Sequence, residues 1–579
     1  MIIKNKQNNI IHYHSIKIGS NDYLIDRFLE IFPFSMAILI FLLPLLLSFR
    51  YPILVASFII TYDVLWLFRA FGYALHLING YRLLKKAVSY NWQEECKKIN
   101  NKNSYLEELK KEKEKIDRNY PLIKIPFLNR ILISFQKKRL SYKKIKEKIN
   151  FLQYLIRNKI EIKDYRKIYH LVILPTYKEP IEVLEDSVKS LINSYPKEKL
   201  FFVLATEERD KEQALKNAQI LEQKFAKYFG LFAHIMHPDN LPGEVKGKGA
   251  NITYAAKNIL KVIKKKKIAP EDIIVTTLDA DTCIHPQYFW RLTYEYIINP
   301  ERIHCSFQPI PIYSNNIWDV PPPITIISIS CSFWQIIQSS RAHLLRNFSV
   351  HAQSLKTLLD TNFWSVKTIV EDGHQFWRTF MCYNGYHKVI PLFIPVYQDA
   401  VLGKNFWQTA KKQYLQLRRW AWGVTDFPYV IKNFIINKKI PWWQKFLESW
   451  HVFEAPFSQA TAPLIITFVA WMPIFLNPRF SRSDVLALNL PKVCSGLLTI
   501  SMIGLMISAI ISTLLIPEPP AKSYYRQKNK FILLLEWIFV PAISIFFSSL
   551  PALDAQFKLA RGHYMEIPGF FVVEKIRKK

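Results

Sequence analysis

Cysteine and glycine are scarce in this sequence, with six cysteines and 15 glycines among 579 residues. No two cysteines form a Cys-x-x-Cys pair, so the sequence indicates neither a zinc site nor a disulfide framework, and we expect a reduced setting. The start of the chain has no short apolar stretch that ends in a small-residue cleavage site, so we expect no removable signal peptide. No glycine-rich segment has the spacing of a Walker loop, which argues against an ATPase.

Acidic residues are also outnumbered, since 78 Lys and Arg face 46 Asp and Glu and leave a formal net charge of +32. Such an excess suits nucleic acid, anionic lipid or phosphorylated substrates. No zinc-finger or RNP-like signature accompanies it, and we expect no nucleic acid partner. The basic residues gather beside apolar segments, notably in 81–169, as the positive-inside rule predicts for a protein in a lipid bilayer.

Long apolar runs are present at both ends of the chain. In the N-terminal segment, 1–80, the runs 33–49 and 52–77 are each long enough to cross a hydrocarbon core of ~30 Å. Buried helices of a soluble protein are the competing interpretation, but the leucine-rich run and the basic flanks favour two spans. Within 441–579 we expect about three more spans, near 459–476, 494–516 and 531–551.

Five spans create a conflict at the C-terminus. The linker 517–530 carries four basic residues and one acidic residue, so it should be cytoplasmic, and a fifth span would then place the tail outside. The tail 575–579 is strongly basic, which argues for the cytoplasm. Either the last run, which Glu536 and Pro541 interrupt, is re-entrant or a further span exists, and the sequence leaves both open.

The part between the apolar ends has two characters. Residues 81–169 are rich in Lys and Glu with weak helical periodicity, which predicts a charged helical connector. In 170–440, short apolar runs alternate at first with segments of helical composition, which predicts a parallel sheet with crossover helices. Ligands bind beyond the carboxyl ends of such strands. The predicted strands are 171–174, 201–205, 231–236 and 273–278.

Polar residues follow the first two strands. Pro175, Thr176, Tyr177 and Glu179 come after the first strand, where they are candidates to cradle a nucleotide base or ribose. Glu207 comes after the second, where a carboxylate can accept a hydrogen bond from uracil or ribose. A turn or a capped helix start explains both stretches equally well.

A glycine-dense segment and a carboxylate pair follow. The segment 243–251 contains Lys248 and is suited to phosphate binding, with a flexible surface loop as the alternative. Asp279 and Asp281 follow the hydrophobic run 273–278. In an extended segment residues i and i+2 point the same way, so both carboxylates can face a diphosphate and a divalent cation such as Mg²⁺ or Mn²⁺.

Two later segments complete the set. Glu371 and Asp372 are adjacent carboxylates, an arrangement that raises a pKa and suits a general base, although an acidic helix start is the simpler explanation. In the run 416–423, indole rings can stack on a pyranose and guanidinium groups can pair with a diphosphate. An interfacial Trp/Arg belt is the alternative. Aromatic segments at 324–337 and 441–457 are either interfacial helices or ordinary core helices.

In combination these motifs resemble those of membrane-integrated glycosyltransferases of family 2, the group that contains cellulose, hyaluronan and chitin synthases. Pro175-Thr176-Tyr177, Asp279-Ala280-Asp281, Glu371-Asp372 and Gln416-Leu417-Arg418-Arg419-Trp420 occur in the order of that family's D, DxD, [T/x]ED and QxxRW motifs. The resemblance covers about 170–425. Thr206-Glu207-Glu208 stands where the family has Asp-Asp-Gly, and Val370 stands where it has Thr.

The resemblance implies an α/β GT-A (Rossmann-like) domain in the cytoplasm, flanked by transmembrane helices of the plasma (inner) membrane. It also implies a UDP-sugar donor, Mg²⁺ or Mn²⁺ and inversion at the anomeric carbon. The implied roles are Glu207 near uridine, Lys248 and Asn251 near the donor phosphates, Asp279 and Asp281 at nucleotide and metal, Asp372 as base beside Glu371, Gln416 and Trp420 at the acceptor, and Arg419 at the diphosphate.

We therefore expect transfer of a sugar from a nucleotide sugar to a growing glycan, with processive polymer synthesis as one form of it. A non-processive transferase that acts on a lipid-linked acceptor is the alternative within enzymes. A membrane scaffold or transporter with an inactive cytoplasmic domain is the alternative from another class, and it has no need of Asp279, Asp281 and Asp372 together.

Overall fold

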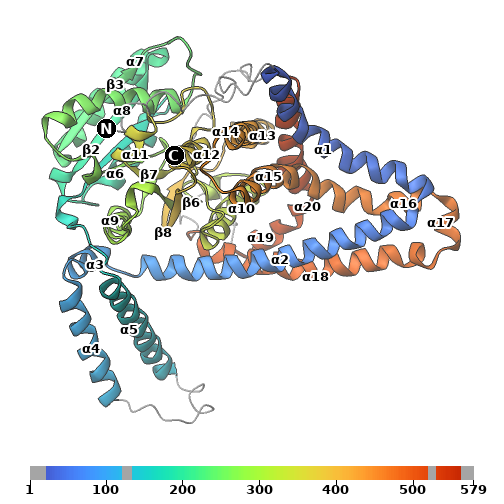
Figure 1. Ribbon diagram of the computed structural model, residues 1–579, viewed down its shortest axis with the longest axis horizontal. Coiled ribbons are helices and arrows are strands. Elements are labelled where there is room, and N and C mark those ends of the chain that lie inside the picture. The colour runs from blue at the N-terminus through green and yellow to red at the C-terminus, as the bar shows by residue number, and fades with distance from the viewer. Residues whose placement is uncertain (1–20, 120–132, 519–529, 563–579) are drawn as a thin grey trace.

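The computed structural model describes residues 21–119, 133–518 and 530–562. Five helical segments in these ranges are long and apolar enough to cross a membrane, as the hydropathy pattern predicts. Those that form the stalk of Figure 1 are α1 (Asp22–Arg50), α2 (Pro52–Val88), α15 (Trp442–Phe468) with α16 (Met472–Leu476), and α18 (Val485–Leu515).

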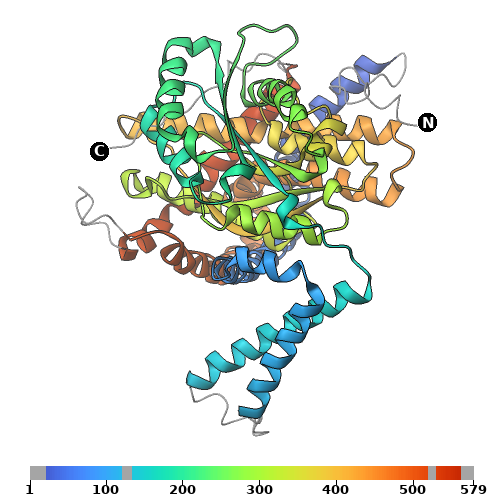
Figure 2. The ribbon, with the colours of Figure 1, turned by 90° about the vertical axis from the view of Figure 1, so that its left-hand side faces the viewer.

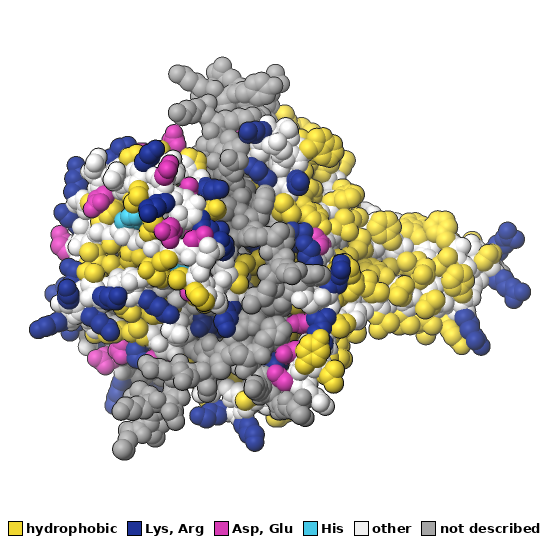
Figure 3. Space-filling view, turned by 90° about the horizontal axis from the view of Figure 1, so that it is seen from above, with side chains coloured by type: hydrophobic (Ala, Val, Ile, Leu, Met, Phe, Trp, Pro, Cys, Tyr) yellow, Lys and Arg dark blue, Asp and Glu magenta, His cyan; other side chains and the backbone are white. Residues whose placement is uncertain are grey.

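The stalk has an apolar shaft and a basic tip (Figure 3). At the tip, the Asn477 side chain donates to the backbone oxygens of Ser48 and Phe49, at 3.3 and 3.0 Å. Arg479 and Arg482 are exposed beside it. Exposed leucine, isoleucine and phenylalanine side chains cover the shaft. Such a surface is favourable in the hydrocarbon core of a membrane and unfavourable in water.

The last apolar segment does not reach that tip. It consists of α19 (Lys530–Leu535), α20 (Val540–Ser544) and α21 (Leu550–Ala560), joined by a 3-10 turn that contains Glu536 and by a π turn. Its first residue, Lys530, pairs with Glu518 beyond the end of α18 at 2.7 Å. At its other end Phe557 packs on Phe34 of α1, with ring centroids 5.3 Å apart.

Both ends of this segment therefore lie at the domain end of the stalk (Figure 1). Glu536 and Pro541 interrupt it, and helices break where a proline removes a backbone hydrogen bond. This placement of both ends favours the re-entrant alternative, which stays a prediction. The basic tail 575–579 and most of the linker 517–530 lie outside the described residues.

A helical hairpin projects from the domain (Figures 1 and 2). It follows the short helix α3 (Trp92–Ile99) and consists of α4 (Lys102–Asn119) and α5 (Ile133–Arg157). At its base, the Lys148 ammonium lies 2.5 Å from Glu95 and 2.9 Å from the Tyr294 hydroxyl. The connector is helical, as its composition predicts, although α2 continues to Val88 rather than ending near 77.

One mixed sheet of eight strands forms the centre of the domain, in the order β3-β2-β1-β4-β7-β6-β8-β5. Strands β1 to β4 are parallel and coincide with the four predicted runs, while β7 is antiparallel to both of its neighbours. The strands are β1 (Tyr169–Pro175), β2 (Leu200–Glu207), β3 (Leu231–His237), β4 (Ile273–Thr277), β5 (Cys283–Ile284), β6 (Cys305–Tyr313), β7 (His351–Ser354) and β8 (Lys388–Gln398).

Helices cover both faces of the sheet because alternate strand side chains point to opposite sides. Val172 and Leu174 belong to one buried cluster, while Leu171 and Ile173 belong to the other. The predicted class, an α/β domain flanked by candidate membrane helices, is confirmed. The covering helices are α6 (Ile181–Leu191), α7 (Lys211–Phe225), α8 (Lys248–Lys265), α9 (Tyr288–Ile298), α11 (Leu355–Asp360) and α12 (Glu371–Cys382).

Three helices lie between the sheet and the stalk: α10 (Pro322–Ser340), α13 (Phe406–Ala421) and α14 (Asp426–Ile436). Most of α10 is buried, so the segment 324–337 is a core helix of this chain. The first turns of α15 instead expose Trp442, Trp443, Phe446 and Trp450. An exposed row of aromatic rings at the start of an apolar helix is typical of a membrane–water interface.

Candidate active site

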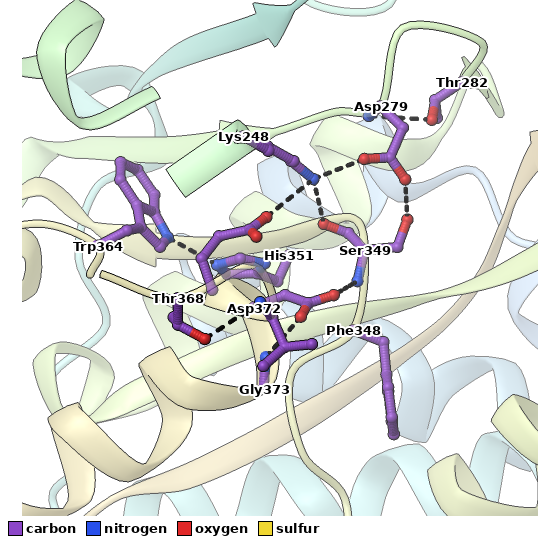
Figure 4. A network of polar contacts seen from close by, with 12 residues as sticks. Lys248, Asp279, Thr282, Phe348, Ser349, His351, Trp364, Thr368, Asp372 and Gly373 are labelled. Atoms are coloured by element: carbon purple, nitrogen blue, oxygen red, sulfur yellow. Dashed lines mark hydrogen bonds and ion pairs between the residues drawn. The ribbon is translucent and has the colours of Figure 1, made fainter. Parts of the chain in front are cut away.

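The site lies at the carboxyl end of β4, where the strand runs into Asp279 and Asp281. One oxygen of Asp279 lies 2.6 Å from the Lys248 ammonium. Its other oxygen accepts hydrogen bonds from the Ser349 hydroxyl and from the Gln398 amide, the latter at 2.9 Å. Asp281 is 3% exposed and accepts a hydrogen bond from the backbone N–H of Asp399 at 2.9 Å. Both carboxylates are held in place by the surrounding chain. Figure 4 shows Asp279 with its partners Lys248 and Ser349.

Lys248 connects three parts of the site. Its ammonium donates to the backbone oxygen of Ser349 at 3.0 Å and lies 3.8 Å from the Glu371 carboxylate, in addition to its contact with Asp279. Burial alone would lower the pKa of Lys248, but the charges of Asp279 and Glu371 outweigh burial and raise it. Lys248 therefore places a permanent positive charge between two carboxylates that come from distant parts of the chain.

The adjacent carboxylates Glu371 and Asp372 start α12 and point to different surroundings. Glu371 is 4% exposed, and burial raises its pKa to about 7, with Lys248 opposing the rise and Asp372 adding to it. Asp372 is partly exposed and accepts hydrogen bonds from the backbone N–H groups of Ser349, at 2.5 Å, and Gly373, at 2.8 Å. Asp372 is therefore the member of the pair that is open to a ligand, while Glu371 lies against Lys248.

Ser349 joins the two halves of the site, and sequence reasoning missed it. Its backbone N–H donates to Asp372, its hydroxyl donates to Asp279 and its carbonyl accepts from Lys248. Its φ of +38° is uncommon for a residue other than glycine and is strained. Gln398, at the end of β8, contacts the same hydroxyl at 2.8 Å and was missed too. Neither residue belongs to a recognisable motif, so no sequence signal marks them.

A cavity of about 230 Å³ opens beside this centre, beyond the carboxyl ends of β2 and β3. Its wall includes Glu207, which is 6% exposed, and Arg209, whose Nε donates to one Glu207 oxygen at 2.7 Å. The Arg209 guanidinium lies over the Tyr177 ring, 4.2 Å from its centroid. Burial raises the pKa of Glu207, although Arg209 opposes the rise. His237 and Glu244 form a second pair in the wall, 2.8 Å apart.

The other residues predicted near the donor hold the chain together. The Thr176 hydroxyl donates to Glu179 at 2.7 Å, and the backbone N–H of Tyr177 donates to the same oxygen, so Glu179 closes the turn after Pro175. The Asn251 amide donates to the backbone oxygen of Ala205 at 3.0 Å and thereby ties α8 to β2. These side chains therefore hold the backbone after β1 and the start of α8 in place.

The segment Gln416–Trp420 lies in the last turns of α13. Gln416 accepts a hydrogen bond from Gln413 at 3.3 Å, and Arg418 pairs with Asp554 of α21 at 3.0 Å. Arg419 is partly buried, and Trp420 is 37% exposed. The Trp420 ring lies 6.2 Å from the ring of Tyr313 at the end of β6. The motif therefore places an accessible indole beside the strand ends and anchors the last apolar segment through Arg418.

A divalent cation would meet few protein ligands here. Among the described residues, no group of three or more His, Cys, Asp or Glu side chains is arranged to hold a metal ion. Asp279 and Asp281 supply two carboxylates at one strand end. Mg²⁺ commonly takes one or two carboxylates and completes its shell with phosphate oxygens and water, so this pair fits a cation that arrives with a diphosphate.

Comparisons with known proteins give low overall similarity. No protein-family model and no curated protein matches the chain. Among solved structures, a mannosyltransferase of Pyrobaculum calidifontis in complex with GDP-Man and Mn²⁺ is 14% identical, with a TM-score of 0.36 over 59% of this chain and 86% of that one.

Two further structures match a smaller share of their own length. GalNAc-T7 with UDP, GalNAc and Mn²⁺ is 12% identical, with a TM-score of 0.27, and TarS of S. aureus is 14% identical, with a TM-score of 0.28. The matches cover 50% and 56% of this chain and 57% and 55% of those chains. The chain thus spans little more than half of either protein.

Proposed function

We propose that the chain is a membrane-embedded, inverting, metal-dependent glycosyltransferase of the family 2 type, which moves a sugar from a nucleotide sugar to a growing glycan. The observation that carries the proposal is that Ser349 contacts both Asp279 and Asp372. Lys248 in turn lies between the carboxylates of Asp279 and Glu371. This arrangement brings Asp279, which would face the donor diphosphate, and Asp372, which would face the acceptor hydroxyl, together at the carboxyl end of the strands. Transfer from a nucleotide sugar requires such a pair. The GT-A type is proposed because the parallel strands β1 to β4 all end at the side of the sheet that carries this site.

The cavity beside the site suits a nucleobase that carries a C=O next to an N–H. Arg209 donates to one oxygen of Glu207, and among the described residues the second oxygen has no hydrogen-bond partner. The pair therefore offers a nucleobase one acceptor, the second Glu207 oxygen, beside one donor, the Arg209 guanidinium. Uracil presents the complementary edge, which supports a UDP-sugar, and guanine presents a similar one. Adenine and cytosine present a ring acceptor at the same place, which the Glu207 carboxylate would repel.

Transfer needs a base for the attacking hydroxyl and charge compensation for the departing nucleotide. Asp372 takes the proton of the acceptor hydroxyl as that oxygen attacks the anomeric carbon, and a single displacement inverts the configuration there. Lys248 and Arg419 supply positive charge toward the donor phosphates. A bound Mg²⁺ or Mn²⁺, held by Asp279 and Asp281, would neutralise charge on the diphosphate. Gln416 and Trp420 border the acceptor.

The orientation in the membrane is part of the proposal. The catalytic domain and the re-entrant segment lie at one end of the stalk, and the exposed arginines Arg50, Arg479 and Arg482 lie toward the other. The connector 81–169 is the most basic part of the chain, and by the positive-inside rule this supports a cytoplasmic domain end. The plasma (inner) membrane is proposed from the family resemblance. The acceptor glycan would then grow from the cytoplasmic face.

The first test is incubation of membranes that contain the full chain with radiolabelled UDP-, GDP-, ADP- and CDP-sugars and Mg²⁺ or Mn²⁺, followed by sizing of the product. We expect incorporation from a UDP-sugar into a long glycan. A short product that partitions with lipid would assign the chain to the non-processive class. Absence of both transfer and donor hydrolysis with every sugar would leave the scaffold or transporter hypothesis.

The second test separates the two adjacent carboxylates. Asp372→Asn removes the base and keeps its shape, so transfer should fall by roughly 10²- to 10⁴-fold while UDP affinity stays near that of the wild type. Glu371→Gln weakens the contact with Lys248, so it should act mainly on donor affinity. Glu301→Gln, on an exposed carboxylate that pairs with Lys388, serves as the matched control. Near-normal transfer by the Asp372 variant would move the base to another residue.

A further inference from the structure

Tyr313 lies where the donor side and the acceptor side of the site meet. It ends β6, in register with Gln398 of β8, whose amide contacts both Asp279 and Ser349. Two residues further on, the Asn315 side chain donates to the backbone oxygen of Asp281 at 3.1 Å. The chain around Tyr313 is thus connected to the Asp279 carboxylate through Gln398 and to the backbone of Asp281 through Asn315.

The side chain of Tyr313 is paired with an accessible indole. Its ring lies 6.2 Å from the Trp420 ring, at an interplanar angle of 38°, and Trp420 is 37% exposed. The backbone N–H of Tyr313 donates to the Ser332 hydroxyl of α10 at 3.2 Å, which fixes the end of the strand. Two rings from separate elements, β6 and α13, therefore form one aromatic surface at the strand ends.

The hydroxyl of Tyr313 is kept as a hydrogen-bond donor. Burial, together with the nearby thiol of Cys331 and the charges of Asp279 and Asp372, raises its pKa well above the ordinary value. A protonated phenol can donate to a sugar hydroxyl or ring oxygen, while its ring packs on the apolar face of a pyranose. The two aromatic rings can therefore pack on the apolar face of a sugar, while the phenol hydroxyl donates a hydrogen bond to one of its oxygens.

We propose that Tyr313, with Trp420, forms the platform on which the terminal pyranose of the acceptor rests, so that its attacking hydroxyl faces Asp372. The inference rests on the proposed function and deepens it, because it names a further acceptor-binding residue and a pyranose as the group bound there. Removal of the ring should weaken the acceptor and spare the donor.

The test uses the full chain in detergent with the donor that the wild type turns over, and a panel of trisaccharides of glucose, N-acetylglucosamine and mannose as acceptors. Tyr313→Ala should raise the acceptor KM by about 10-fold, the scale of one aromatic contact. Its UDP affinity and its acceptor-free donor hydrolysis should stay within about twofold of the wild type. Tyr313→Phe keeps the ring and should restore most of the acceptor affinity.

The control is Tyr169→Ala, since Tyr169 starts β1 at the amino end of the strands, opposite the site, and its ring packs on Phe201. An unchanged acceptor KM in Tyr313→Ala would overturn the inference. So would an equal loss in Tyr313→Phe, because the ring would then not be the binding element, or a parallel loss of UDP affinity, which would place Tyr313 at the donor. A wild type that neither transfers nor hydrolyses any donor would overturn the proposed function, and this inference with it.

Discussion

Gly249 gives the sharpest test of how tightly the centre of the site is built. It is the second residue of α8, directly after Lys248. A Cβ atom at this position would lie 2.5 Å from the backbone oxygen of Ser365 and 3.0 Å from Cβ of Glu371. Neither neighbour is the end of a flexible side chain, because one is backbone and the other starts α12. Gly249→Ala therefore forces two elements apart.

The size of the effect follows from these contacts. Ordinary contact begins at 3.4 Å, so the start of α8 and the Ser365 loop must separate by roughly 0.9 Å. Overpacking of this kind costs about 1–3 kcal/mol of stability. Lys248 moves with α8, and a displacement of about 1 Å at a reacting centre can lower the rate by about 10²-fold. We expect transfer to fall by about that factor.

Thermal unfolding in detergent and single-turnover transfer measure the two effects separately. Gly72→Ala is the matched control, since nothing lies within 4 Å of the added methyl group and Gly72 is inside α2. It should be neutral or stabilise by up to about 1 kcal/mol. Wild-type melting and transfer by Gly249→Ala would refute the close contact between α8 and α12, and with it the assembly of Lys248 and Glu371.

Three further predictions concern other parts of the chain. Lys432 is fully buried beside Asp26 at 2.5 Å, so Lys432→Met should destabilise by about 3–5 kcal/mol in thermal unfolding. Wild-type melting of this variant would refute the ion pair between α1 and α14. Burial raises the pKa of Glu371 to about 7, so the protonated side chain stabilises the fold fully below about pH 4.5, and this contribution is lost as the pH rises through about 7. The melting temperature of the wild type should therefore fall relative to that of Glu371→Gln over this pH range. Parallel plots of melting temperature against pH for the two proteins would contradict the prediction. Single cysteines in place of Arg479 and Arg561 should be labelled from opposite sides of the membrane, and labelling from one side would refute the re-entrant segment.

The strands that the sequence predicted are those with uninterrupted apolar runs. β1, β2 and β4 are buried on both faces, so their composition alone identifies them. β6 and β8 contain prolines, Pro309 and Pro311 in the first and Pro391 and Pro395 in the second, and proline within a run argues against a central strand. A shift in register between these two strands accommodates the prolines. Such an irregularity depends on the partner strand and has no local signature.

The path of the last apolar segment in the structure also depends on tertiary contacts. Hydropathy measures length and composition, and 531–551 satisfies both. What turns the chain back is the set of contacts at its two ends, which include Lys530 with Glu518 and Asp554 with Arg418. The partners are close in sequence in one case and far apart in the other. Only the basic tail hinted at the outcome, through its conflict with the span count.

The site shows the same division between local and distant information. Asp279, Asp281, Glu371 and Asp372 were proposed because each pair stands in a pattern that a strand end or a helix start makes meaningful. Ser349 carries no such pattern, yet its backbone and hydroxyl contact both pairs.

The role of Ser349 depends on its left-handed φ, which a serine in a sequence does not predict. Tyr313 and Arg209 are similar cases, since each acquires its place from a residue on another element, Trp420 and Tyr177. Groups that perform chemistry are constrained in type, so a sequence exposes them. Groups that hold those in place are constrained only in position, which the folded chain alone determines, and substitutions at Ser349 and Tyr313 should therefore report on geometry before they report on chemistry.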